Sequence, residues 1–337
     1  MNKTASTPDR SVKSNSIGGK LVTGSQVYLK RNAGILIGLA ALCIIISANS
    51  PIFLTEKNIM NVMRQISSNL YLATAMMMVI ISGGIDLSVG SSIAVIGVLA
   101  GMLVEAGLPL ALVLLACLVA GALIGTINGF IITRTTMPPF IVTLAMMNIL
   151  RGFAYVYTGG TTVRIDNESF INIGTGYLGF MPLPVVYLLV ILIGVYLFLS
   201  KSRGGRHLYA VGGNEKAAKF SGINVKNLRL GIYIFSGIMA AVAGITLSAR
   251  SYSGNPIAGN GAEMDAIAAC VLGGTSMLGG YGYVGGTIIG ALIIGILSNG
   301  LNLMGIDSFW QIILKGVVIL LAVYIDYIKN RNKNESN

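Results

Sequence analysis

The stretch KSRGGRHLYAVGGNEKAAKFSGINVKNLR, residues 201–229, is a polar and strongly basic run between two long apolar segments. Its only acid is Glu215. Short loops rich in Lys and Arg stay on the cytoplasmic side of a membrane, so this loop sets the predicted orientation of the whole chain. The basic residues of the loop are Lys201, Arg203, Arg206, Lys216, Lys219, Lys226 and Arg229.

The middle of this loop, NEKAAKF at residues 214–220, is typical of a short helix. The chain enters it through the turn Gly212-Gly213 and leaves it at Gly222. A short cytoplasmic helix between two membrane-embedded halves could be pushed by a partner protein. The alternative is a solvated loop that has no partner and only obeys the charge rule.

The composition predicts a membrane protein. Of the 337 residues 54% are hydrophobic and 10% are charged, whereas soluble domains carry about a quarter of charged residues. One spanning helix takes roughly 20 residues, so we predict an all-α polytopic membrane protein with about ten transmembrane helices, or about eight as the alternative, some of them broken or re-entrant. Its predicted parts are a cytoplasmic polar tail at 1–32, a transmembrane domain at 33–326 that contains the cytoplasmic loop 200–229, and a second cytoplasmic tail at 327–337.

Several classes of protein are excluded. The net charge of +11 could indicate nucleic-acid binding, but the charges lie in the tails and loops, where the membrane charge rule places them. The three cysteines lie inside apolar runs without metal-ligand spacing. No HExxH, paired CxxC or GxSxG motif is present, and the one Gly-Lys dipeptide lacks the context of a phosphate loop. The sequence therefore predicts no nucleic-acid partner, no enzyme site, no metal site and no cofactor on this chain.

Apolar segments account for most of the remaining sequence. Counted from a cytoplasmic start, they place the loop 201–229 and both termini in the cytoplasm. Residues 55–67 are mixed in polarity and are interpreted as an interfacial helix outside the membrane. The predicted spans lie near 34–48, 70–81, 89–104, 108–133, 140–157, 184–199, 230–247, 264–278, 284–303 and 310–325.

Four charged residues fall inside predicted spans, where each costs about 2.5 to 3.5 kcal/mol: Asp86, Arg151, Asp265 and Lys315. One interpretation is architectural, with Arg151 and Lys315 each neutralising Asp265 or Asp86. The other is a polar lining for a hydrophilic solute, because the glycines around Asp86 can unwind a helix and expose its backbone. The candidate lining residues are Asp86, Ser88, Asn128, Asn148, Arg151, Asp265 and Lys315.

The two halves of the chain share a pattern that predicts an internal repeat. GALIG precedes Asn128-Gly129 in the first half, and GALIIG precedes Asn299-Gly300 in the second. The glycine breaks SGGIDLSVGS and LGGTSMLGGYG also correspond. Repeats with broken helices are common in transporters.

Three classes of transport protein remain: the membrane subunit of a pump powered by a separate ATPase, a secondary carrier that uses an ion gradient, and a passive channel. A proton-coupled carrier more often places several acids or histidines deep in its bundle. Two acids and no histidine lie in the predicted spans. The separate-ATPase hypothesis is therefore favoured.

Five long segments carry a family resemblance. They are ISGGIDLSVGSSIAVIG, MPPFIVTLAMMNILRGFAYVYT, GRHLYAVGGNEKAAKFSGINVKNLRLGIYIFSGIMAAVAGI, EMDAIAACVLGGTSMLGGYGYVGGTIIGALIIGILSNGLNLMGI and WQIILKGVVILLAVYID. Together they resemble the ribose-type permeases, the membrane subunits of carbohydrate-uptake ABC transporters. Relatives in that group handle galactose, xylose, arabinose, allose and the autoinducer-2 signal. The resemblance runs from about residue 52 to 326 and leaves out the N-terminal tail and the loop near Asn167.

The resemblance implies partners for this chain in a bacterial cell membrane. These are a second copy of the permease, a cytoplasmic ABC ATPase with two fused nucleotide-binding domains that holds ATP and Mg, and an extracytoplasmic sugar-binding protein. It also implies that the ATPase contacts one segment of the basic loop. The residues of that segment are Asn214, Glu215, Lys216, Ala217, Ala218, Lys219, Phe220, Ser221 and Gly222.

The function that the resemblance implies is uptake of a monosaccharide, ribose or a related pentose or hexose, delivered by the binding protein. Two alternatives stay open. One is an ion-gradient-driven secondary sugar carrier, and the other is ABC uptake of a sugar-like signal such as autoinducer-2.

Overall fold

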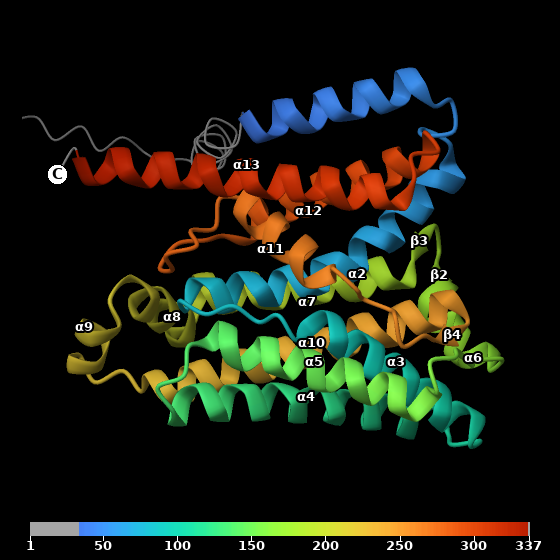
Figure 1. Cartoon of the computed structure of the whole chain (residues 1–337), viewed down its shortest axis with the longest axis horizontal. Coiled ribbons are helices and arrows are strands. Elements are labelled where there is room, and N and C mark those ends of the chain that lie inside the picture. Colours follow the sequence, from blue (N-terminus) through green and yellow to red (C-terminus); the bar gives the residue numbers. More distant parts are fainter. Residues whose placement is uncertain (1–33, 336–337) are drawn as a thin grey trace, which may run out of the picture.

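The structure is a computed structural model that describes residues 34–335. The predicted tail at 1–32 lies outside the described residues. The described chain is a bundle of helices with two very short strand pairs (Figure 1). The first helix is Gly34–Asn49, and the others are α2 (Glu56–Ile81), α3 (Val89–Glu105), α4 (Leu110–Arg134), α5 (Pro139–Thr158), α6 (Glu168–Thr175), α7 (Leu183–Lys201), α8 (Arg203–Gly213), α9 (Glu215–Phe220), α10 (Val225–Ser251), α11 (Ala262–Leu272), α12 (Val284–Leu303) and α13 (Ser308–Glu335).

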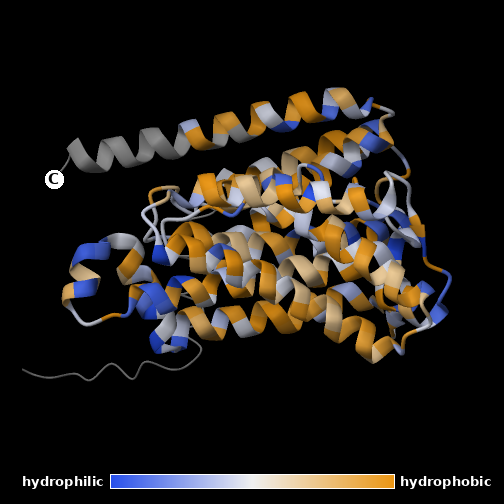
Figure 2. Ribbon diagram, turned by 60° about the horizontal axis from the view of Figure 1, so that its bottom comes forward, coloured by the Kyte–Doolittle hydropathy of each residue, from blue (hydrophilic) through white to orange (hydrophobic). Residues whose placement is uncertain are grey.

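Helices occupy every predicted apolar segment, so the prediction of an all-α polytopic membrane protein is confirmed. By length and composition α4, α5, α7, α10 and α12 can each cross a membrane, and Gly34–Asn49, α3 and the Ser308–Val318 part of α13 are shorter apolar helices. Hydrophobic residues cover the sides of the bundle, while hydrophilic residues gather at the end formed by α8 and α9 and in the loops opposite (Figure 2). The total of about ten spans stays a prediction.

The predicted helix at 55–67 is present but is not separate from the predicted span that follows it, and its place outside the membrane stays a prediction. These residues form the first part of α2, a continuous helix of 26 residues. Thr55 caps it, because its side chain accepts a hydrogen bond from the Asn58 backbone N–H at 3.4 Å. No Gly or Pro interrupts the sequence from Glu56 to Ile81. The polar residues of this stretch therefore lie within one long helix.

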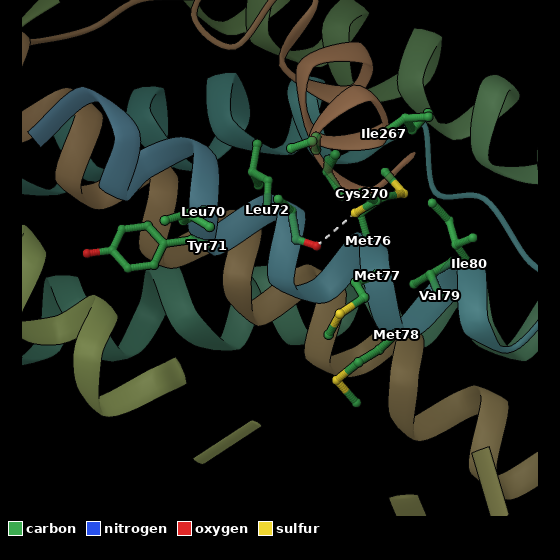
Figure 3. Packing of buried hydrophobic residues seen from close by; sticks show 14 of the residues in the cluster. Leu70, Tyr71, Leu72, Met76, Met77, Met78, Val79, Ile80, Ile267 and Cys270 are labelled. Atoms are coloured by element: carbon green, nitrogen blue, oxygen red, sulfur yellow. Dashed lines mark hydrogen bonds between the residues drawn. The ribbon is translucent and has the colours of Figure 1, made fainter. Parts of the chain in front are cut away.

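The core lies along the second half of α2. Every residue from Leu70 to Ile81 is buried. Figure 3 shows this run packed against Ile267 and Cys270 of α11, and the Cys270 thiol donates to the Ala73 carbonyl at 3.2 Å. Burial on all sides explains why this run is almost wholly apolar.

The helical path of the chain is interrupted in two places, between α2 and α3 and between α10 and α11. After α2 ends, residues 82–88 turn back into the bundle before α3 begins, and after α10 ends, residues 252–261 turn back before α11 begins (Figure 1). α11 has 11 residues, about 16 Å of helix, which is half of the hydrocarbon thickness. The predicted span at 264–278 is thus too long, because the helix ends at Gly273 and turns follow.

The starts of α3 and α11 meet inside the bundle. A Cβ atom on Gly90, in the first turn of α3, would collide with the Gly259 carbonyl and the Glu263 carboxylate. Gly259 has φ +70°, which only glycine adopts readily. These contacts bring together two half-helices that enter the bundle from opposite ends.

Glycines set the close packing of the long helices. In α4, Cβ atoms on Gly121 or Gly125 would collide with the backbone of α10. In α12, a Cβ atom on Gly290 would collide with the Ala269 carbonyl of α11, and one on Gly295 would collide with Ile66 of α2. α4 therefore packs on α10 as α12 packs on α2, an arrangement that fits the predicted internal repeat.

Candidate functional site

The predicted docking helix is present as α9, at the hydrophilic end of the bundle. Asn214 caps it, since its Oδ1 atom accepts the Ala217 N–H at 3.0 Å. Gly222, with φ +82°, lies directly after the turn that ends the helix. The Phe220 side chain is 93% exposed. An exposed aromatic ring on a short polar helix is typical of a contact with another protein.

Ion pairs attach α9 to the bundle. The Glu215 carboxylate lies 3.1 Å from Lys219 Nζ and 2.8 Å from Arg229 Nη2. The Arg229 guanidinium also donates to the Ser82 carbonyl at 3.1 Å. Partial burial alone would raise the pKa of the Glu215 carboxyl, but the hydrogen bonds and charges of Lys219 and Arg229 hold that pKa below its ordinary value. One side chain, Arg229, thus connects α9 to the end of α2.

α8 lies against the two glycine-rich breaks, residues 82–91 and 272–282. The Gly280 N–H donates to the Ile81 carbonyl at 2.9 Å, which joins the two breaks to each other. Gly212 of α8 fits against this junction, where a Cβ atom would collide with the Ile81 carbonyl and the Gly280 nitrogen. The Tyr209 hydroxyl donates to the Gly282 carbonyl at 2.8 Å. A displacement of α8 and α9 would therefore reach both discontinuous helices.

Asp86, Ser88 and Asn128 are brought together, as the prediction of a common lining requires. Asp86 is 1% exposed. Its Oδ1 atom accepts the Ser88 N–H at 3.1 Å and the Ser88 hydroxyl at 2.6 Å, and its Oδ2 atom accepts the Ser236 hydroxyl at 2.8 Å. Asn128 Nδ2 donates to the Ser88 hydroxyl at 2.8 Å. The cluster ties the start of α3 to α4 and α10 inside one protomer.

Lys315 contacts α11, and Arg151 contacts the segment before α11. Lys315 Nζ lies 2.8 Å from Asp265 Oδ2, which confirms the predicted pairing with that acid. Arg151 pairs with neither predicted acid: its Nη1 atom donates to the carbonyls of Pro256 and Ala258 at 2.7 and 2.8 Å, and it interacts electrostatically with Glu263. The carbonyls of the non-helical segment 252–261 thus accept the hydrogen bonds of this guanidinium. Asp86 pairs with neither cation in the described part of the chain.

Asn148 lies apart from the other candidates. It is exposed on α5, and its Nδ2 atom donates to the Leu144 carbonyl of its own helix at 3.2 Å. A role for Asn148 and Arg151 along a translocation path stays a prediction.

Several polar residues were missed from the sequence. Glu263, in the first turn of α11, is 8% exposed, and its proximity to Asp265 could have indicated it. Gln65, Ser68 and Asn69 of α2 line a cavity of about 120 Å³ together with Asp265 and other residues. Their i, i+3, i+4 spacing places them on one helical face. This spacing could have indicated them, but the predicted interfacial helix at 55–67 ended before Ser68 and Asn69.

Larger cavities of about 470, 700 and 910 Å³ have almost wholly apolar walls at the sides of the bundle. Among the side chains that the structure describes, no group of three or more His, Cys, Asp or Glu could hold a metal ion.

Comparison with known proteins identifies relatives along most of the chain. It is 46% identical over 299 residues to the ribose import permease protein RbsC of Bacillus subtilis, covering 88% of this chain and 93% of that protein. It is 44% identical over 295 residues to RbsC of Escherichia coli K12, covering 86% and 92%. It is 37% identical to the xylose transport system permease protein XylH of the same strain, with an alignment of 341 residues that covers 83% and 87%. No solved structure matches the chain at a significant level.

A family model described as "branched-chain amino acid transport system / permease component" matches residues 58–323. This range takes in the chain from α2 into α13, including both discontinuous helices, α8 and α9. The chain therefore belongs to this family of membrane-spanning permease components of transport systems.

Proposed function

We propose that this chain is the permease subunit of an ATP-binding-cassette importer that takes up ribose or a closely related monosaccharide. The observation that carries the proposal is its 46% identity to a ribose import permease over 88% of the chain. The working unit comprises two copies of this chain in a bacterial cell membrane, a cytoplasmic ATPase and an extracytoplasmic sugar-binding protein. ATP and Mg are held by the ATPase.

The charges inside the bundle favour a neutral solute. The starts of α3 and α11, which carry the positive ends of two helix dipoles, meet where Glu263 is buried against Gly90. The Asp265 carboxylate is paired with Lys315. Arg151 interacts electrostatically with Glu263, so a carboxylate on the solute, such as that of an amino acid, would meet balanced charges rather than an open positive site. A sugar has only hydroxyls to place, so it crosses with transient hydrogen bonds.

The ATPase docks at α9. Phe220 offers an exposed aromatic anchor, and the basic loop 201–229 places this helix in the cytoplasm. Both termini of the chain are then cytoplasmic. The opposite end of the bundle, with the loops 159–183 and 250–261, receives the loaded binding protein.

ATP binding closes the ATPase dimer and displaces α9. Because Arg229 joins α9 to the Ser82 carbonyl, and because α8 lies against the contact between Ile81 and Gly280, the displacement reaches both breaks. α3 and α11 then move relative to each other, and the translocation path changes the side to which it opens.

Uptake by the reconstituted complex tests this proposal. Proteoliposomes would hold the permease and the ATPase, with radiolabelled ribose and the binding protein outside and ATP inside. Accumulation should require ATP and the binding protein and should persist after a proton ionophore collapses the proton gradient. Accumulation by the permease alone, driven by an imposed proton gradient, would overturn the proposal in favour of a secondary carrier.

A further inference from the structure

A half-open cavity of about 120 Å³, with mostly apolar walls and several polar side chains, lies among α2, α3, α10, α11 and α12. Its lining side chains on α2 begin at Gln65, ten residues into a helix of 26 residues. At about 1.5 Å per residue this is close to the middle of α2. Gly259 and Asp265, at the start of the half-helix α11, form the facing wall. The cavity thus lies close to the middle of α2 and beside the interrupted helix α11, a position like that of solute sites in secondary transporters.

Three polar side chains of α2 reach this cavity without a protein partner. Gln65, Ser68 and Asn69 line it, and none of them forms a side-chain hydrogen bond with any described residue. Their neighbour Ser67 differs, because its hydroxyl donates to the Met63 carbonyl at 2.7 Å and faces away from the cavity. All three side chains are partly exposed, so their polar groups are free to bind water or a solute in the cavity.

The size and charge of the cavity restrict what can enter. Its volume of about 120 Å³ equals the share of about four liquid waters. This is less than a whole monosaccharide, so a sugar enters this half-open cavity with one edge of its ring. The one acid in the wall, Asp265, is paired with Lys315, so the lining has no net charge. Leu72, Ile93 and Leu247 add an apolar side. Hydrogen-bonding groups opposite an apolar surface match a sugar, which has hydroxyls at its edge and C–H groups on its faces.

We propose that this cavity is a solute-binding site of the permease itself, and that it takes a neutral polyhydroxylated molecule of monosaccharide size. The inference rests on the proposed function and deepens it, because it gives this chain a share in recognising the sugar. Gln65, Ser68 and Asn69 bind the solute hydroxyls, and the apolar wall contacts its C–H face.

Thiol labelling of the purified full-length permease in lipid nanodiscs tests the site. In a Cys43→Ala background, the variant Ser68→Cys is treated with a small hydrophilic thiol reagent with and without 10–100 mM ribose (a range chosen for ~mM transient binding). Labelling should be readily detected, and ribose should slow it about threefold or more. The matched control Ser67→Cys should label slowly and show no effect of ribose. Equal labelling of Ser68→Cys with and without ribose, xylose and galactose would overturn the inference.

Uptake by the complete complex provides an independent readout. Gln65→Leu and Asn69→Leu should each raise the sugar concentration needed for half-maximal uptake about three- to tenfold, the loss expected for one hydrogen bond. Ser67→Ala should leave it unchanged. Unchanged uptake in both leucine variants would refute the site while leaving the proposed function intact. Failure of the unaltered complex to take up any sugar would instead refute the proposed function.

Discussion

Arg229 and Glu215 lie on different helices, α10 and α9, with 2.8 Å between Nη2 and Oε2. The same Arg229 nitrogen donates to the Ser82 carbonyl at the end of α2. A flexible surface loop would not need such a bridge. The pair fixes α9 to the bundle, and it places the segment before α3 one side chain away from α9, the proposed docking helix.

Replacing Arg229 with alanine should uncouple ATP hydrolysis from transport. The ATPase would still bind α9, but movement of α9 would no longer reach Ser82. We expect uptake per ATP hydrolysed to fall about tenfold, a change of about 1.4 kcal/mol in coupling. The measurement is the ratio of sugar accumulated to phosphate released in proteoliposomes.

The control for this experiment is Lys226→Ala, an exposed basic residue at the start of the same helix. It should leave the ratio unchanged. The double variant Glu215→Arg with Arg229→Glu should recover part of the coupling, since it restores the pair in the opposite sense. A normal ratio in Arg229→Ala would show that the bridge does not transmit movement.

The attachment of α9 should depend on pH in a defined direction. The pKa of Glu215 is held below its ordinary value of 4.5 by Lys219 and Arg229. A lowered folded-state pKa gives stability that is present above pH 4.5 and is lost as the pH falls through the lower folded value. Amide hydrogen exchange of α9 should therefore be protected from pH 7 to about 4.5 and accelerate beyond the intrinsic rate change below it. Glu215→Gln should lack this transition, and loss of protection already above pH 5 would contradict the assignment.

Asp86 should be important for stability. Asp86→Ala removes three hydrogen bonds from a fully buried cluster, which we expect to cost about 3 kcal/mol at about 1 kcal/mol each. Ser91→Ala is the matched control, because its buried hydroxyl has no partner among the described residues. Thermal unfolding in detergent should show a clear loss for Asp86→Ala and little change for Ser91→Ala. Equal midpoints for the two variants would refute the clustering.

Two adjacent glycines of α8 should behave differently. A Cβ atom on Gly212 would collide with the Ile81 carbonyl and the Gly280 nitrogen, whereas one on Gly213 would meet nothing within 4 Å. Gly212→Ala should lower the yield of folded permease or its uptake severely, because backbone atoms on both sides cannot move aside without separating the two breaks. Gly213→Ala should be tolerated. Similar behaviour of both variants in a size-exclusion and uptake assay would contradict the contact of α8 with the breaks.

Much of this architecture was predictable because membrane helices follow from local composition. The predicted span at 284–303 coincides with α12, and the predicted docking helix at 214–220 is α9 with its cap. Both depend on residues close together in the sequence. The pairing of Lys315 with Asp265 was one of several possibilities, since the sequence alone cannot decide which distant charges meet.

Other features were not predictable in this way. Hydropathy averaged along the stretch 55–67 cannot distinguish a helix in the interface from a helix that turns Gln65 and Ser68 toward an internal cavity. Arg151 was assigned to an acid because sequence patterns show side-chain acceptors only. Its hydrogen bonds go to the backbone carbonyls of Pro256 and Ala258, which are available because the segment before α11 is not helical. The acid with which it interacts electrostatically is Glu263.

The central claim is that a separate ATPase drives transport through α9, and site-specific photo-cross-linking tests it most directly. A photo-reactive phenylalanine analogue in place of Phe220 would be compared with one in place of Tyr252, which is exposed at the opposite end of the bundle. In membranes that take up sugar, the account predicts that position 220 cross-links to the ATPase and that position 252 does not. Cross-linking of the ATPase from position 252, or none from position 220 in a transporting complex, would contradict it.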